Sequence, residues 1–164
     1  KDSTPGILGV IADIIKVEKQ YETAIETALG GTIQNIVTDK ENTAKELINY
    51  LKVNKLGRAT FLPLNAIHSR NTLENDNCIN EKGVVGVASN LVRVSFEYEG
   101  LAKYLLGRIL VVDNIENALV IARKYKYSLR IVTLEGEQLN PGGSMTGGAF
   151  KNSSNLLGRI REIE

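Results

Sequence analysis

Short runs of apolar, mostly β-branched residues alternate along this chain with stretches whose apolar residues recur at helical spacing. The runs are short enough for strands and rich in residues that suit a pleated sheet. They span residues 7–15, 34–38, 58–64, 83–88, 91–96, 109–112 and 129–134. The helical stretches span residues 21–29, 44–51, 98–106 and 115–125. This alternation predicts a fold of the α/β or α+β class, in which helices pack on sheets.

Local sequence signals mark where the first predicted helix ends and where the second begins. Gly30 and Gly31 follow the first helix and supply a C-terminal stop. Asp39 or Asn42 is a candidate N-cap for the second helix.

A faint internal repeat suggests two lobes. Residues 36–44 (IVTDKENTA) resemble residues 110–118 (LVVDNIENA), and a Leu-Gly pair precedes each copy. Any strand–Asp–helix unit resembles another because Asp caps helices, so the pattern alone leaves a true repeat open. Residues 68–82 are rich in Asn, Asp, Glu and Ser and have little periodicity, which is typical of a surface loop. The economical layout is two lobes joined by this loop.

The glycine-rich segment 141–148 (PGGSMTGG) admits two interpretations. A phosphate cradle would aim successive backbone N–H groups at an anion. The Walker A lysine is missing after Gly148, however, and the adjacent Gly142 and Gly143 break the dinucleotide-binding spacing. Glycine also lets two backbones approach closely because it has no Cβ. We favour a packing or interface segment and keep an anion site as the alternative.

Few residues in this chain of 164 suit catalysis. His68 and Cys78 are its one histidine and one cysteine, and both fall in the predicted loop, where surface positions without a role are expected. One cysteine excludes an internal disulfide framework, and one histidine excludes a histidine-rich metal site. Asp13, Asp39 and Asp113 stand at strand ends or helix starts, where capping explains them. We therefore expect no enzyme, no cofactor and no metal.

The charge balance excludes nucleic-acid binding by bulk positive charge. Lys and Arg total 20 against 19 Asp and Glu, a net charge of +1, so any such contact is a local patch. Residues 123–127 (RKYKY) mix cations with aromatic rings, but the end of a solvated helix has the same composition, and we favour that interpretation. Lys151, Arg159 and Arg161 form a second candidate patch, whose binding would depend on salt and not on base sequence.

Targeting and membrane signals are not visible in the sequence. The polar start lacks a secretory signal, and the longest apolar runs are far below the roughly 20 residues that span a bilayer. An unpaired thiol favours a reducing cytoplasm. Residues 156–164 have the pattern of an amphipathic helix that stops midway, and the first residue is not Met. We expect a piece cut from a longer protein.

Seven strings, in order along nearly the whole chain, carry a family resemblance. They are GILGVIAD (6–13), YETAIETALG (21–30), GRATFLPL (57–64), GVASNLV (86–92), LLG (105–107), IVTLEG (131–136) and NPGGSMTGG (140–148). Together they resemble the hinge domain of SMC (structural maintenance of chromosomes) proteins in its bacterial form. The third and the last string are the most specific, and residues 68–82 match no motif.

The resemblance implies the α+β fold of SMC hinges, with two lobes of mixed sheets and flanking helices. Residues 1–150 would form the hinge, and residues 151–164 would begin the coiled-coil helix that leaves it. Lobe one would span about 6–67, the linking loop 68–82 and lobe two about 83–150. Such a hinge joins two SMC chains, with each lobe meeting the opposite lobe of its partner. It is not catalytic, because ATP hydrolysis in the family belongs to head domains outside this chain.

Partners and site residues are also implied by the resemblance. It implies a homodimer whose interface residues are Gly142, Gly143, Ser144, Met145, Thr146, Gly147 and Gly148. It implies non-specific DNA contact through Lys151, Arg159 and Arg161, kleisin-type accessory subunits for the full-length protein, and a role in chromosome condensation and segregation at the bacterial nucleoid. The alternatives are a small α/β ligand-binding domain or enzyme that uses segment 142–148 as an anion site, and an oligomerisation module without a nucleic-acid role.

Overall fold

Short strands and helices alternate along the chain, as the sequence pattern predicts, and form an α+β fold. The computed structural model describes residues 5–68 and 71–149. The strands are β1 (Ile7–Val10), β2 (Lys16–Val17), β3 (Ile36–Thr38), β4 (Phe61–Pro63), β5 (Val84–Val87), β6 (Val92–Arg93), β7 (Ile109–Val112), β8 (Arg130–Thr133), β9 (Gln138–Leu139) and β10 (Met145–Thr146). The α-helices are α1 (Ile11–Ile14), α2 (Glu22–Leu29), α3 (Glu41–Val53), α4 (Glu99–Leu106) and α5 (Ile115–Lys124).

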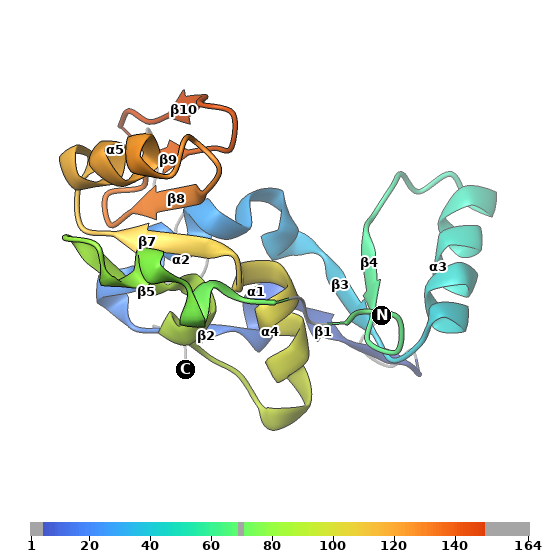
Figure 1. Cartoon of the computed structure of the whole chain (residues 1–164). Helices are drawn as coiled ribbons and strands as arrows, with labels where there is room; N and C mark the ends of the chain where they lie inside the picture. Colours follow the sequence, from blue (N-terminus) through green and yellow to red (C-terminus); the bar gives the residue numbers. More distant parts are fainter. Residues whose placement is uncertain (1–4, 69–70, 150–164) are drawn as a thin grey trace.

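The strands form three sheets. A three-stranded sheet has the order β1-β3-β4, a five-stranded sheet has the order β10-β9-β8-β7-β5, and β2 pairs with β6. The β3–β4 and β7–β8 pairs are parallel, and the other pairs are antiparallel. In Figure 1 the strand β4 and helix α3 stand to the right, apart from the five-stranded sheet on the left. The structure therefore presents β4 and β10 at the outer edges of two different sheets.

The same succession of elements occurs twice along the chain. A strand, a helical turn, a short strand, a helix, a strand, a helix and a strand run from β1 to β4 and again from β5 to β8. In both copies the central strand, β3 or β7, lies between an antiparallel and a parallel neighbour. The antiparallel pair β2–β6 joins the first copy to the second. The lobe boundaries at 6–67 and 83–150 stay a prediction.

Matching hydrogen bonds support this internal repeat. The Asp39 N–H donates to the Gly6 carbonyl at 2.9 Å, and the Asp113 N–H donates to the Gly83 carbonyl at 2.9 Å. Each of these aspartates then accepts a hydrogen bond from a side chain four residues later in the following helix. The Thr43 hydroxyl donates at 2.6 Å in the first copy, and an asparagine amide donates at 2.9 Å in the second.

The two copies share one hydrophobic core. All four residues of β7 are buried, and alternate residues point to opposite faces of the sheet. Ile109 and Val111 pack in a cluster that includes residues of the first copy, such as Ile25 in α2. Leu110 and Val112 pack in a second cluster with residues of α5. The first cluster contains residues of both copies, so the two copies are packed together through a shared core.

The prediction of one strand over residues 7–15 was wrong. The chain turns into α1 after β1 and becomes extended again only at β2. Ile11 and Ile15 are both buried, at 0% and 2% exposure, and their spacing of four residues is helical. A continuous apolar run does not distinguish a buried helical turn from a strand by periodicity. The predicted strand over 91–96 likewise shortens to β6, between two 3-10 turns.

The prediction of a surface loop over residues 68–82 was wrong in part. Two 3-10 turns, Leu73–Asn75 and Asn77–Asn80, occupy it, and Leu73 and Cys78 are each only 1% exposed. Both side chains pack in the second hydrophobic cluster, so this segment covers part of the core. His68 is exposed, as expected.

Neither candidate N-cap of α3 caps the helix with its side chain. Lys40 occupies the N-cap position, and Asp39 instead accepts the hydroxyl hydrogen bond from the helix. That bond holds the pKa of the Asp39 carboxyl below its ordinary value. Within the described residues, no helix is both long and apolar enough to cross a membrane.

Candidate functional site

The glycine-rich segment lies at the edge of the five-stranded sheet. Residues 141–149 are all exposed, and β10 is the last strand of the sheet, paired on one side with β9. Met145 stands opposite Leu139 in this pair, and its side chain is 48% exposed. The other side of β10 faces no strand among the described residues, so its backbone groups are available for pairing.

Internal hydrogen bonds shape the turn that leads into β10. The Asn140 N–H donates to the Ser144 carbonyl at 2.9 Å, and the Gly143 N–H donates to the Asn140 carbonyl at 2.9 Å. The Gly142 N–H donates to the Tyr127 carbonyl at 2.8 Å. The φ angles of Gly142 and Gly143 are +94° and +110°, which side chains with a Cβ rarely adopt. Two amides that an anion cradle would need are thus already bonded, which favours the interface interpretation of this segment.

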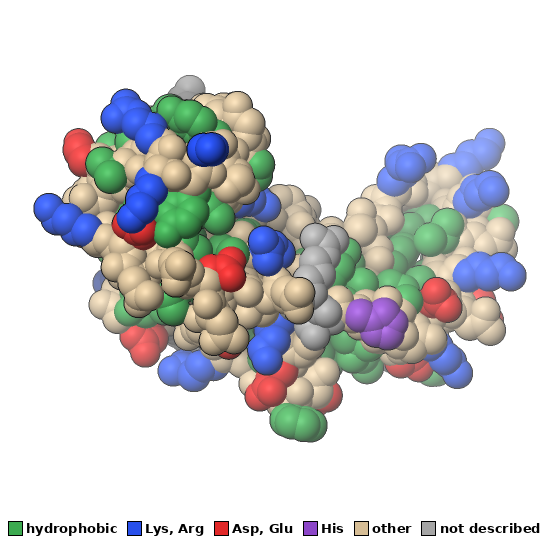
Figure 2. Space-filling view, viewed as in Figure 1, with side chains coloured by type: hydrophobic (Ala, Val, Ile, Leu, Met, Phe, Trp, Pro, Cys, Tyr) green, Lys and Arg blue, Asp and Glu red, His purple; other side chains and the backbone are tan. Residues whose placement is uncertain are grey.

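A second exposed edge lies on the other sheet. β4 pairs with β3 on one side and, among the described strands, ends the sheet on its other side. A groove of about 360 Å³ lies beside α3 and the segment before β4, and we call it the α3–β4 groove. It is lined by Ile48, Leu51, Lys52, Lys55, Gly57, Arg58 and Ala59. None of these lining residues is acidic. Figure 2 shows Lys and Arg side chains around this part of the molecule, across a hollow from the larger sheet.

Helix α3 is less covered than its counterpart α5. Helix α5 contacts β7, β8 and β9 and buries Ala118, Ile121 and Ala122. Helix α3 contacts β3 and β4, and Ala44 is its buried residue. Ile48, one of the apolar residues at helical spacing in the stretch 44–51, is 50% exposed. The five-stranded sheet continues past β8 into β9 and β10, whereas the three-stranded sheet ends at β4. Among the described strands, none therefore takes the place beside α3 that β9 takes beside α5.

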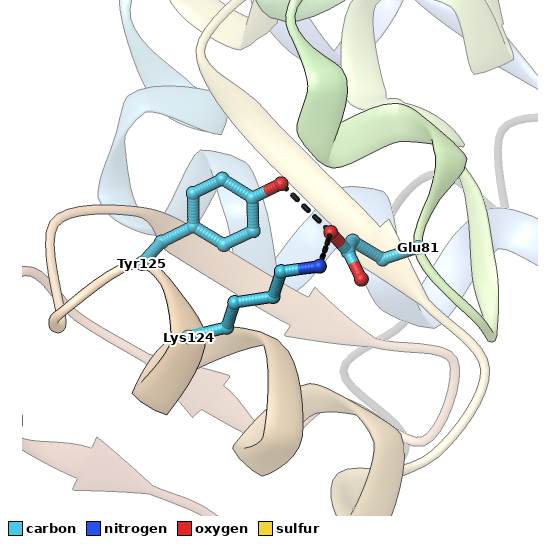
Figure 3. Close-up of polar contacts among 3 residues, drawn as sticks. All are labelled: Glu81, Lys124 and Tyr125. Carbon is cyan, nitrogen blue, oxygen red and sulfur yellow. Dashed lines mark hydrogen bonds and ion pairs between the residues drawn. The ribbon is translucent and has the colours of Figure 1, made fainter.

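The basic and aromatic segment 123–127 is held within the fold. The Lys124 ammonium and the Tyr125 hydroxyl both lie 2.8 Å from the same oxygen of Glu81, as Figure 3 shows. The two contacts, from Lys124 first and then from Tyr125, hold the pKa of the Glu81 carboxyl below its ordinary value. The hydrogen bond to Glu81 raises the pKa of Tyr125 to about 12, so its hydroxyl keeps donating at neutral pH. This geometry supports the structural interpretation of the segment over a stacking surface for nucleic acid.

Replacing Glu81 by glutamine is expected to lower the stability of the chain at neutral pH and to have less effect in acid. The folded state holds the pKa of this carboxyl below its ordinary value. The resulting stabilisation is therefore present above the ordinary pKa and is lost as pH falls through the lowered one. Thermal unfolding of both proteins between about pH 3 and pH 7 measures the difference. Glu135→Gln, at an exposed position, is the matched control. A pH-independent difference would contradict the assignment.

Cys78 and His68 do not resemble a catalytic pair. Burial raises the pKa of the Cys78 thiol, which opposes the thiolate that a nucleophile requires, whereas His68 is exposed. The described residues contain no group of three or more His, Cys, Asp or Glu side chains placed to hold a metal ion.

The structure brings together one of the two predicted sites. Residues Gly142 to Gly148 share one sheet edge, but whether this edge is an interface stays a prediction. Lys151, Arg159 and Arg161 lie outside the described residues. Sequence reasoning missed the α3–β4 groove. The signal for it is the helical spacing of the apolar residues in the stretch 44–51, which include Ile48 and Leu51 and which a core-facing helix would also show.

Comparisons with known proteins identify the family to which this chain is similar. The family model described as "SMC proteins Flexible Hinge Domain" matches residues 4–122. The chromosome partition protein Smc of Desulfitobacterium hafniense is 47% identical over 159 residues, which cover 96% of this chain and 13% of that protein. This chain thus spans about an eighth of the length of that relative.

Two solved structures are similar along most of the chain. One is an asymmetric dimer of the Geobacillus stearothermophilus SMC hinge domain, with a TM-score of 0.90 and 44% identity over 99% of this chain and 66% of that one. The other is the Pyrococcus furiosus SMC hinge domain, with a TM-score of 0.75 and 35% identity over 93% of this chain and 78% of that one.

Proposed function

Because this chain belongs to the family of SMC flexible hinge domains, we propose that it joins two SMC chains as a homodimer. The observation that carries the proposal is that two of the edge strands, β10 on one sheet and β4 on the other, are each left without a partner on one side by the described strands. A strand with free backbone groups and exposed apolar neighbours is suited to pairing with another chain. The proposed interface comprises the segment from Gly142 to Gly148 of one copy and the α3–β4 groove of the other.

Complementary features support this pairing of edge and groove. The β10 edge carries glycines, which allow close backbone approach, and the exposed Met145 side chain. The groove offers the apolar Ile48 and Leu51 beside a sheet edge and a helix that lacks a third covering strand. A partner's β10 would extend the sheet past β4 and bury part of the exposed face of α3. Burial of this apolar surface supplies the driving force.

Two-fold symmetry closes the assembly. Each chain has one β10 edge and one groove, so a symmetric pair makes the same contact twice and leaves neither feature uncovered. Sedimentation equilibrium at several protein concentrations tests this function directly. We expect a dimer that dissociates on dilution. A monomer at every concentration would contradict the proposal, and larger open-ended assemblies would contradict the closure.

The role of the whole protein is proposed from its relatives. The similar curated proteins are named for chromosome partition, and we propose that this hinge serves the same process at the bacterial nucleoid. In this proposal ATP hydrolysis belongs to head domains and the kleisin-type subunits bind elsewhere on the full-length protein. The hinge itself contributes the connection between two chains.

We further propose non-specific DNA contact through Lys151, Arg159 and Arg161. Replacing all three by glutamine is expected to weaken DNA binding and to lower the slope of log affinity against log salt by roughly 2 to 3, since each phosphate contact contributes about 0.9. Fluorescence anisotropy with labelled DNA at several salt concentrations measures both. The matched control replaces three exposed cations elsewhere, Lys103, Arg123 and Lys126. An unchanged slope in the first variant would contradict the proposal and favour an oligomerisation module without a nucleic-acid role.

A further inference from the structure

The end of helix α5 has an unusual backbone. Lys126 and Tyr127 follow one another with φ angles of +57° each. Residues with a Cβ rarely adopt this left-handed conformation, and two in succession persist only where surrounding contacts hold them. The segment 123–127 stands out in the sequence for its mixed cations and aromatic rings, which the proposed function does not use.

Several contacts hold this helix end in place. The Tyr127 N–H donates to the Ala122 carbonyl at 2.8 Å, and the Lys126 N–H donates to the Arg123 carbonyl at 3.1 Å. Two residues earlier, Lys124 and Tyr125 each contact Glu81, whose side chain is 19% exposed. The backbone at Tyr127 is thus tied to the helix and, through Glu81, to the segment that links the two sheets.

Tyr127 in turn contacts the glycine-rich turn. Its carbonyl accepts the Gly142 N–H at 2.8 Å, and its ring carbon Cδ1 lies 4.0 Å from the position that a Cβ on Gly143 would occupy. Residues 141–149 are otherwise exposed. A strand rich in glycine loses much conformational freedom when it binds, so any contact that orders it beforehand lowers the cost of binding.

We propose that Tyr127 is a positioning residue for self-association. Its left-handed backbone directs the carbonyl to Gly142 and so holds the turn in the conformation that presents β10 to the partner. This inference rests on the proposed function, because it assumes that the segment from Gly142 to Gly148 is the interface. It adds that a residue outside the glycine-rich segment sets the affinity by shaping that segment before contact.

The role of the left-handed backbone at Tyr127 can be tested with two variants, both of which lack the aromatic ring. Valine is β-branched and opposes the left-handed region, whereas asparagine tolerates it. We expect Tyr127→Val to raise the dimer dissociation constant at least tenfold above that of Tyr127→Asn. Tyr127→Phe should match the original chain. Sedimentation equilibrium measures the three constants. Should the valine variant fail to fold, Tyr127→Ala replaces it, with an expected difference of about threefold.

Hydrogen exchange at the Gly142 amide gives a readout that needs no partner. Measured by NMR in a chain made monomeric by Ile48→Glu, exchange should be at least tenfold faster with Tyr127→Val than with Tyr127→Asn. Equal exchange rates and equal dissociation constants for the two variants would overturn the proposal. If substitutions at Ile48 and Met145 also left the dimer intact, the proposed interface itself would fail. If they disrupted it while the Tyr127 variants stayed equal, only the positioning role would fail.

Discussion

A chain carrying Ile48→Glu is expected to stay folded and to sediment as a monomer where the original chain is a dimer. Ile48 is 50% exposed in the single chain, so a charge there costs the isolated fold little. In the proposed dimer the same side chain is covered by the partner's β10 edge, so a carboxylate there loses its water and replaces an apolar contact. The dissociation constant should rise about 100-fold, equal to about 2.8 kcal/mol. Sedimentation equilibrium measures it, and circular dichroism checks the fold.

The matched control lies on the same helix. Val53 is 68% exposed on α3 but does not line the α3–β4 groove, so Val53→Glu adds the same charge outside the proposed interface. It should dimerise as the original chain does. Met145→Glu changes the other side of the proposed contact and should weaken the dimer as Ile48→Glu does. Equal dissociation constants for Ile48→Glu and Val53→Glu would refute the assignment of the groove.

The second large effect concerns the fold itself. Gly83→Ala should destabilise the chain by about 2–4 kcal/mol, the sum of backbone strain and a lost hydrogen bond. Gly83 has a φ of +91°, and a Cβ there would lie 2.6 Å from the Asp113 Oδ1 atom and from the Asn117 amide nitrogen. The added methyl group therefore displaces the bond between these two side chains. Urea unfolding measures the loss.

Gly57→Ala separates the cost of backbone strain from the cost of the lost hydrogen bond. Gly57 has nearly the same φ, +93°, but a Cβ there meets nothing within 4 Å, so it carries strain without displacement. Both variants are best compared in the monomeric Ile48→Glu background, where self-association does not contribute to stability. Gly6→Ala should behave as Gly83→Ala does, because its Cβ would meet Thr43 and Asp39 in the equivalent place. Equal losses for Gly57→Ala and Gly83→Ala would exclude the displacement.

Strongly periodic elements could be predicted from the sequence, and elements set by distant contacts could not. The strand over residues 109–112 could be predicted with its observed bounds, because four consecutive apolar, mostly β-branched residues indicate a core strand. β9 and β10 have two residues each, and neither has a pattern of its own. They exist because the turn between them, pinned by Tyr127, sets the pairing of Met145 with Leu139.

The candidate site divides in the same way. The glycine-rich segment is recognisable in the sequence as a place of close backbone approach, and the family resemblance predicts an interface role for it, which stays a prediction. The exposure of Ile48 could not be predicted from the sequence. The apolar spacing in α3 indicates a covered face, and only the structure shows that the described sheet ends at β4. The bond from Tyr125 to Glu81 joins residues 44 positions apart and has no local signal.

The separation of the β10 edge from the α3–β4 groove has a consequence for how the proposed dimer dissociates. Because the β10 edge and the α3–β4 groove lie on different sheets, the two contacts of a symmetric pair are distinct and can break one at a time. While one contact holds, the broken one faces its partner at an effective concentration in the millimolar range, far above that of free chains. Opening of one contact is then brief and reversible, and dissociation of the two chains requires both contacts to be broken at the same time. In the proposed dimer, the avidity of the two contacts together, more than the strength of either one, sets the lifetime.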